Sequence, residues 1–148
     1  MADGLVALCQ TAVETTLSQQ QVEPPAGLSL LLTGDEQIQQ LNRDYRGLDR
    51  PTDVLSFPAG EAMPGMTETA RYLGDIVISV PYATRQAEAE GHTPAAELQL
   101  LAVHGVLHLL GYDDEEMASR QAMWGEQAEI LAQLGVAVTL PREDDDGQ

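Results

Sequence analysis

The chain has 148 residues and a formal net charge of −17, because 24 acidic residues face only seven basic ones, all of them arginine. This length suits a single domain with a real hydrophobic core, and the acidic excess should repel nucleic acid at long range. Cys9 is the only cysteine, which excludes an internal disulfide and a cysteine-based zinc site. The N-terminus does not read as a secretory signal, and no apolar run approaches the roughly 20 residues that span a bilayer, so we expect a soluble protein.

Hydrophobic periodicity and turn-forming residues predict five helices and three or four short strands. Thr33 and Glu36 have the spacing of a capping box and predict a helix start. Gly111 is placed to end a helix in the left-handed conformation. In chain order, we predict a helix over 5–17, a strand over 28–33, a helix through residue 45, strands over 54–57 and 74–80, helices over 81–90, 94–110 and 115–134, and a short final strand at 136–140.

The order of these elements suggests one mixed sheet in an α+β, or α/β-like, domain spanning residues 1–141. Residues 94–110 are apolar on nearly all sides, which is typical of a central buried helix. The last helix should bury Met117 and Trp124, with Trp124 as a core residue rather than a ligand platform. Residues 142–148, "REDDDGQ", form an acidic tail that we predict to be disordered.

The segment "HGVLHLLGYDDEE", residues 104–116, carries the clearest chemical signal. His104 and His108 are four residues apart on a helix, so the two imidazoles lie on one face and can converge on one point. Gly111 lets the chain turn back, which brings Asp114 toward the same helix end, where the helix dipole also favours a cation. Two histidines and one carboxylate make a common catalytic zinc set. The simpler alternative, weighed equally, is a pair of core histidines bonded to backbone or solvent.

Three ordered blocks resemble the YbeY-type endoribonucleases: "NRDYRGLDRPTDVLSFP" (42–58), "LGDIVIS" (73–79) and "HGVLHLLGYD" (104–113). The resemblance covers roughly residues 28–135. It implies an α+β fold with a mixed sheet, one zinc ion per chain and cleavage of single-stranded RNA. It also implies a cytoplasmic protein that works with ribosomal RNA precursors and the ribosome, in 16S rRNA 3′-end maturation and ribosome quality control. His104 and His108 match the first two metal ligands, and Arg46 matches the arginine associated with activity.

The chain departs from the family pattern HxxxHxxGxxH at its last position, where Asp114 replaces the third histidine. Asp114 could bind the metal directly, bind it through a water, or mark a degenerate site; we favour direct ligation. A carboxylate would acidify a bound water less than a third imidazole does. It would also shift the metal preference slightly toward harder ions such as Mn²⁺.

Two other functions remain as alternatives. A zincin-type metallopeptidase would need a glutamate after the first histidine, and that position is Gly105. A non-catalytic ribosome-associated module with a structural metal would need a fourth protein ligand, for which the candidates are Asp113, Glu115, Glu116 and His92. For the nuclease, Arg46 would contact the phosphate, and Arg43, Arg50, Arg71 and Arg85 could extend that contact or be ordinary surface charges. We expect neither DNA nor a membrane as a partner.

Overall fold

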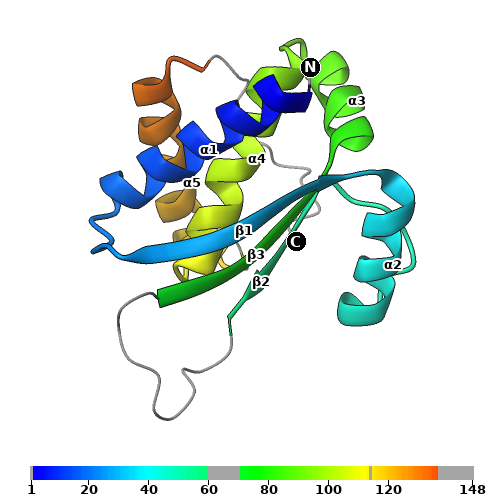
Figure 1. Cartoon of the computed structure of the whole chain (residues 1–148), viewed down its shortest axis with the longest axis horizontal. Helices are drawn as coiled ribbons and strands as arrows, with labels where there is room; N and C mark the ends of the chain where they lie inside the picture. Colours follow the sequence, from blue (N-terminus) through cyan, green and yellow to red (C-terminus); the bar gives the residue numbers. More distant parts are fainter. Residues whose placement is uncertain (1, 60–70, 114, 137–148) are drawn as a thin grey trace.

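The computed structural model describes residues 2–59, 71–113 and 115–136, which form a three-stranded sheet and five helices (Figure 1). The elements are α1 (Ala2–Gln19), β1 (Ala26–Thr33), α2 (Asp35–Arg46), β2 (Val54–Pro58), β3 (Arg71–Ser79), α3 (Val80–Glu90), α4 (Pro94–Leu109) and α5 (Met117–Leu134). The predicted α+β class is therefore confirmed. Residues 137–140 of the predicted final strand, most of the loop before β3 and the acidic tail lie outside the described residues, and Val136 is described without strand structure.

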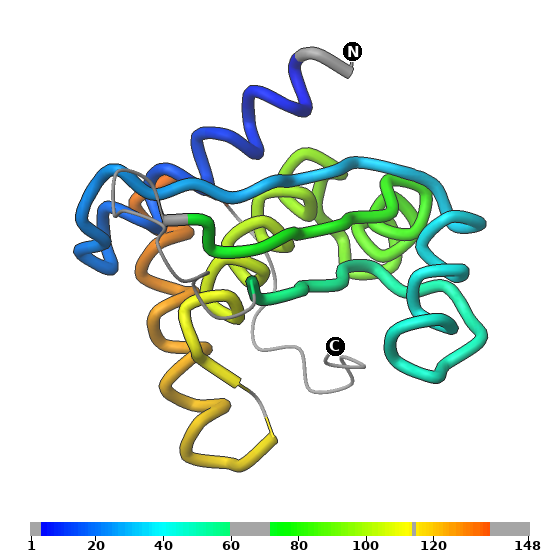
Figure 2. Tube along the Cα trace, turned by 60° about the horizontal axis from the view of Figure 1, so that its bottom comes forward, coloured from blue at the N-terminus to red at the C-terminus, as the bar shows by residue number. Residues whose placement is uncertain are grey.

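The sheet is mixed and has the strand order β1-β3-β2 (Figure 2). The central strand β3 runs parallel to β1, with Ile76 opposite Leu30, and antiparallel to β2, with Ile76 opposite Ser56. Successive side chains of a strand point to opposite faces of the sheet. Ile76 and Ile78 accordingly join the main core with α4, while Val77 joins a smaller core with Ile38 of α2.

Helix α4 is the centre of the main core. Every residue from Ala96 to Leu107 is buried, as its apolar sequence predicts. Figure 1 shows α1, α4 and α5 on one side of the sheet, with α2 away from them. Cys9 of α1 belongs to this core, and burial raises the pKa of its thiol to about 11, which suits a packing residue and not a nucleophile. None of the described helices has the length and hydropathy needed to span a membrane.

Two glycines allow α4 to lie close to the sheet. A Cβ atom on Gly105 would lie only 2.9 Å from Cγ2 of Ile76. A Cβ atom on Gly74 would lie 2.9 Å from Cδ2 of Leu109 on α4, and Gly74 has a φ of +140° that favours glycine. The helix therefore touches β3 next to His104, where a larger side chain has no room.

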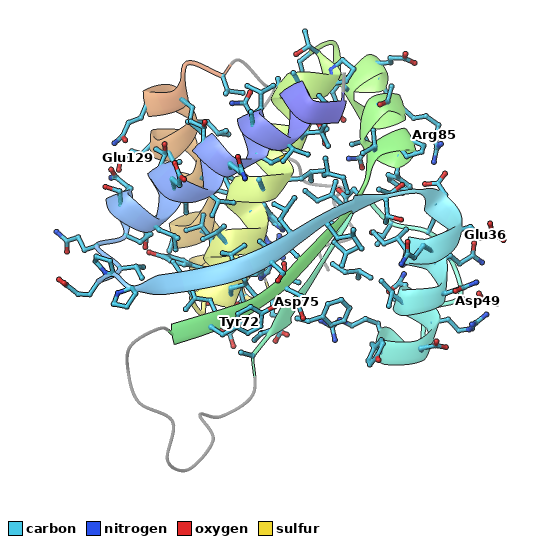
Figure 3. The ribbon with its side chains drawn as sticks, viewed as in Figure 1. Glu36, Asp49, Tyr72, Asp75, Arg85 and Glu129 are labelled. Atoms are coloured by element: carbon cyan, nitrogen blue, oxygen red, sulfur yellow. The ribbon has the colours of Figure 1, made fainter. Side chains whose placement is uncertain are left out.

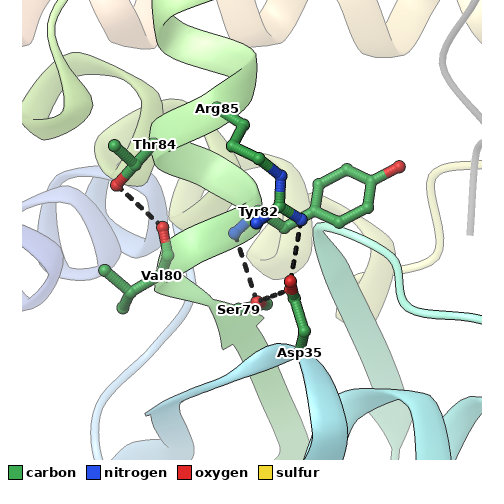
Figure 4. Close-up of polar contacts among 6 residues, drawn as sticks. All are labelled: Asp35, Ser79, Val80, Tyr82, Thr84 and Arg85. Atoms are coloured by element: carbon green, nitrogen blue, oxygen red, sulfur yellow. Dashed lines mark hydrogen bonds and ion pairs between the residues drawn. The ribbon is translucent and has the colours of Figure 1, made fainter.

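The predicted start of α2 is wrong in its detail. Gly34, not Thr33, is the N-cap residue, and Thr33 Oγ1 instead donates a hydrogen bond of 2.5 Å to Gln37 Oε1. Asp35, the first residue of α2, accepts hydrogen bonds from Ser79 Oγ (2.6 Å) and Arg85 Nη2 (2.8 Å) (Figure 4). These contacts connect the start of α2 to the junction of β3 and α3.

Candidate metal centre

His104 and His108 lie on one face of the C-terminal half of α4, as their spacing predicts. His104 is 5% exposed and His108 is partly buried. Their Nε2 atoms are 3.1 Å apart, their ring centroids are 4.5 Å apart and their ring planes meet at 78°. The fold therefore brings the two imidazoles together edge to face, with one nitrogen of each directed at the other.

The other nitrogen of each ring faces a hydrogen-bond acceptor. His108 Nδ1 is 3.0 Å from the carbonyl oxygen of Tyr112, and His104 Nδ1 is 3.0 Å from Oε1 of Gln127. A carbonyl oxygen only accepts, so in the tautomer that satisfies both contacts each Nδ1 donates and each Nε2 keeps its lone pair. In that tautomer the two Nε2 lone pairs face each other across 3.1 Å, an arrangement that a cation between them would stabilise.

The turn after α4 places the carbonyl group that orients His108. Gly111 has a φ of +106°, which confirms the predicted left-handed residue. Its N–H donates to the His108 carbonyl at 3.0 Å, and the Tyr112 N–H donates to the Leu107 carbonyl at 3.0 Å. The Tyr112 hydroxyl donates to Oε1 of Gln20, in the turn that follows α1, at 2.9 Å. The chain thus doubles back so that Tyr112 faces His108 and is bonded to the turn after α1.

The spacing of the two Nε2 atoms suits a divalent metal ion. Zinc bonded to two imidazole nitrogens at about 2.0–2.1 Å in tetrahedral geometry holds those nitrogens about 3.3 Å apart. The third predicted ligand, Asp114, lies outside the described residues. Among the residues that are described, no three His, Cys, Asp or Glu side chains form a group that could hold a metal. The structure therefore brings together two of the three predicted ligands, and Asp114 stays a prediction.

The acidic residues beside Asp114 are directed to solvent where they are described. Asp113 is exposed, and its Oδ1 accepts a hydrogen bond of 3.2 Å from the Glu115 N–H. Glu115 and Glu116 are exposed as well. None of these three described carboxylates makes a metal-binding group with the histidine pair.

His92 belongs to a different, buried network. Its Nε2 is 2.5 Å from Oε1 of Glu97, and the side chains of both residues are almost fully buried. The Gln86 amide donates to Glu97 Oε2 at 2.8 Å and to Asp53 Oδ2 at 3.1 Å. Asp53 also accepts a hydrogen bond of 2.7 Å from the Val54 N–H at the start of β2. This network joins α3, α4 and β2, and among the described residues it gives the histidine pair no further ligand.

Arg46 ends α2 and lies at the edge strand β2. Its Nη2 donates a hydrogen bond of 2.6 Å to the carbonyl oxygen of Ser56, and its guanidinium lies 4.7 Å from the ring centroid of Phe57. The hydroxyl of Ser56 in turn faces the carbonyl oxygen of Gly105 at 3.5 Å. Ser56 therefore connects the Arg46 guanidinium to the turn of α4 that carries His104. A guanidinium has five N–H donors, so Arg46 keeps donors for an anion.

The other arginines that were candidates for backbone contact differ in their surroundings. Arg85 Nη2 pairs with Asp35 at 2.8 Å, and Arg43 Nε pairs with the neighbouring Asp44 at 3.1 Å. Arg50 lies in the loop before β2, where its carbonyl oxygen accepts a hydrogen bond from the buried Asn42 amide. Part of the positive charge predicted for this segment is thus neutralised locally.

Sequence reasoning missed Gln127, which is 3% exposed in α5 and orients His104. It lies 23 residues after His104, and no spacing rule connects the two positions. The only available signal was an amide on an otherwise apolar helix face, which is too common to identify a site. The contact follows from how α5 packs on α4.

Comparison with known proteins gives one consistent result. The family model described as "Endoribonuclease YbeY" matches residues 2–135. The Endoribonuclease YbeY proteins of a Synechococcus strain and of Bacillus mycoides are 50% and 42% identical to this chain. These matches cover 82% and 90% of this chain, and 77% and 89% of the two relatives. A solution structure of a Thermotoga maritima protein superimposes with a TM-score of 0.58 at 26% identity, covering 88% of this chain and 85% of that one. This chain belongs to the YbeY endoribonuclease family.

Proposed function

We propose that this protein is a metal-dependent endoribonuclease that cleaves single-stranded RNA in the cytoplasm, in 16S rRNA 3′-end maturation and ribosome quality control. Membership in an endoribonuclease family supports RNA as the substrate. The observation that supports the metal dependence is the histidine pair, whose Nε2 atoms converge at 3.1 Å while each Nδ1 faces an oxygen acceptor.

His104, His108 and Asp114 would hold one divalent ion, zinc or manganese. Such an ion polarises a phosphate oxygen and lowers the pKa of a bound water. With Asp114 as the third ligand, the site would carry one unit less positive charge than a three-histidine site. The lower charge weakens the acidification of the water and favours harder metals slightly.

The chain's own residues would orient the ligands and bind the phosphate. The carbonyl of Tyr112 and the amide of Gln127 hold the two imidazoles with Nε2 directed into the site. Arg46 would donate two N–H groups to phosphate oxygens and stabilise the charge that develops on them. Its connection through Ser56 to α4 supports this role, because it places the guanidinium on the strand next to the histidine-bearing helix.

The glycine at position 105 is evidence against the metallopeptidase alternative. In a zincin, the residue after the first histidine is a glutamate that activates the water. Here that position faces β3, and a Cβ atom added there would lie only 2.9 Å from Ile76. A glutamate there would point into the core and not toward the histidine pair. The fold thus agrees with a nuclease and leaves this protease mechanism without its base.

The direct test compares substrates and metal states of the full chain. We expect cleavage of single-stranded RNA, little cleavage of the same RNA in a duplex, and no hydrolysis of peptides. Chelation should abolish the cleavage, and added Zn²⁺ or Mn²⁺ should restore it. Metal-independent cleavage, or peptide hydrolysis without RNA cleavage, would contradict the proposal.

A further inference from the structure

An open groove of about 460 Å³ lies on the sheet beside α2. Its lining is mostly apolar and comes from all three strands and from α2. Two of its residues, Leu31 and Tyr45, are large apolar or aromatic side chains with exposed fractions of 44% and 65%. The lining residues are Ser29, Leu31, Leu41, Tyr45, Phe57, Asp75, Ile76 and Val77.

The groove and Arg46 share the ring of Phe57. Tyr45 packs edge-on against Phe57, with ring centroids 5.5 Å apart and planes at 69°. The Arg46 guanidinium lies on the same Phe57 ring, 4.7 Å from its centroid. Phe57 is thus shared by an exposed tyrosine and by the arginine that we assign to the phosphate. An RNA strand held by Arg46 would have Tyr45 within reach of its next base.

We propose that this groove binds one unpaired nucleobase of the RNA substrate, stacked on Tyr45, while Arg46 holds an adjacent phosphate. The inference rests on the proposed function and adds a base subsite to it. Proteins that bind single-stranded RNA commonly combine aromatic rings that stack on bases with cationic groups that follow the backbone.

The polar groups of the groove favour a base over a phosphate. Ser29 and Asp75 lie among its apolar residues, and the Tyr72 hydroxyl, 2.9 Å from Ser29 Oγ, also hydrogen-bonds to Asp75 (Figure 3). The Asp75 carboxylate would repel a phosphate, whereas its oxygens and the Ser29 hydroxyl can bond to the edge of a neutral base. A mostly apolar pocket with a few polar groups is typical of small-ligand sites.

The net charge of the protein is a second reason to expect a base-binding subsite. At −17, the chain as a whole attracts an RNA backbone poorly, so contacts that involve no phosphate gain importance for affinity. Stacking on an aromatic ring is such a contact and depends little on charge. An exposed tyrosine next to the phosphate-binding arginine supplies it where the strand would pass.

The test measures binding of the full, metal-loaded chain to a short single-stranded 2′-O-methyl RNA by fluorescence anisotropy, with probe integrity checked on a gel. Tyr45→Ala should weaken binding roughly 5- to 150-fold, the range expected for the loss of one stacked base. Tyr45→Phe keeps the ring and should bind like the wild type. Tyr82→Ala is the matched control. Tyr82 lies on α3 and is also beside an arginine, with the Arg85 guanidinium 5.3 Å from its ring centroid. Thermal unfolding checks that every variant folds.

A second probe identifies the base as the ligand. An otherwise identical RNA lacks one base, and the abasic position is moved along the strand. The affinity of the wild type should fall when the base is missing at one particular position of the RNA. The affinity of Tyr45→Ala should be the same whether or not that base is present. The inference would be overturned if Tyr45→Ala bound the RNA as tightly as the wild type. It would also be overturned if Tyr45→Ala lost the same factor of affinity, relative to the wild type, on the intact probe and on every abasic probe. A dimer that Tyr45→Ala disrupts while RNA binding persists would overturn it as well.

The failures of the two proposals are distinguishable. If Arg46→Ala loses RNA binding and Tyr45→Ala does not, the base subsite is wrong and the nuclease stands. If the wild-type chain binds and cleaves no RNA, the nuclease proposal is wrong and the base subsite is wrong with it.

Discussion

The Nε2 atoms of His104 and His108 face each other at 3.1 Å, while each Nδ1 faces a carbonyl oxygen at 3.0 Å. With each Nδ1 as the donor to its oxygen, the two Nε2 lone pairs converge on one point. The fold provides these acceptors from two separate places, the turn after α4 and the helix α5. A pair of imidazoles arranged in this way is better suited to hold a cation than to fill a core.

Gln127 should control metal affinity through His104. In Gln127→Leu the His104 N–H loses its buried acceptor, and we expect metal affinity to fall about 10- to 100-fold. Gln127→Glu keeps an oxygen acceptor and should bind metal at least as tightly as the wild type. Competition with a chromophoric chelator measures both. Equal metal affinity in Gln127→Leu would show that the amide does not orient His104 for metal binding. That result would fit a flipped amide whose NH₂ group donates to Nδ1, which puts the hydrogen of His104 on Nε2.

Arg46 should act on the substrate and not on the metal. We expect Arg46→Ala to lower kcat/KM for single-stranded RNA by about 10²–10³-fold, the usual effect of removing one group that stabilises transition-state charge. Metal content should be unchanged. Arg43→Ala, on the same helix and paired with Asp44, is the control and should stay near wild-type activity. An Arg46→Ala enzyme with full activity would leave this arginine without a catalytic role.

Two glycines inside helices should respond oppositely to alanine. Gly125 in α5 has no atom within 4 Å of a new Cβ, so Gly125→Ala should raise the free energy of unfolding by about 0.5–1 kcal/mol. Gly105→Ala would press a methyl group against Ile76 and should lower it by about 1–3 kcal/mol. Urea denaturation measures both. Stabilisation by Gly105→Ala would mean that α4 does not lie this close to β3.

Asp35 should contribute a pH-dependent part of the stability. Desolvation alone would raise its pKa, but hydrogen bonds from Ser79 and Arg85 and the Arg85 charge outweigh it and hold the pKa below its usual 3.8. A lowered folded-state pKa stabilises the protein above the unfolded value, and this stability is lost as the pH falls through the folded pKa. Asp35→Asn should thus cost up to about 1 kcal/mol at neutral pH, since the pair is partly exposed, and almost nothing in strong acid.

Urea denaturation as a function of pH checks this prediction, with Asp44→Asn as the control. Asp44 pairs with Arg43 on the exposed surface of α2 and should have little effect at any pH. A stability difference for Asp35→Asn that stays constant into strong acid would contradict the assignment.

Local patterns predicted the elements and the histidine pair well. Period and length identified all five helices and the three described strands within a few residues, and i, i+4 spacing placed His104 and His108 on one face. The capping box at Thr33 was wrong because Thr33 is the last residue of β1, opposite Ser79 in the sheet. The helix begins one residue later, with Gly34 as its N-cap, and the Thr33 side chain bonds to Gln37.

Contacts between elements that are far apart in the chain could not be predicted from the sequence. Met117 was expected to be buried, yet it is 66% exposed, and Trp124 is only partly buried, with Arg120 5.9 Å from its ring centroid. Periodicity identifies which face of a helix is apolar, but not how far along the helix a neighbouring element covers that face. For the same reason Gln127, which depends on the packing of α5 on α4, could not be assigned.

Metal analysis of the full chain, purified without chelators, tests the central claim most directly. We predict about one equivalent of a divalent ion per chain, lost in the His104→Ala and His108→Ala variants. Asp114→Ala should lose most of it, while the exposed neighbour variant Asp113→Ala keeps it. A folded wild-type chain that binds no divalent ion, or a double histidine variant that still binds a full equivalent, would contradict the account.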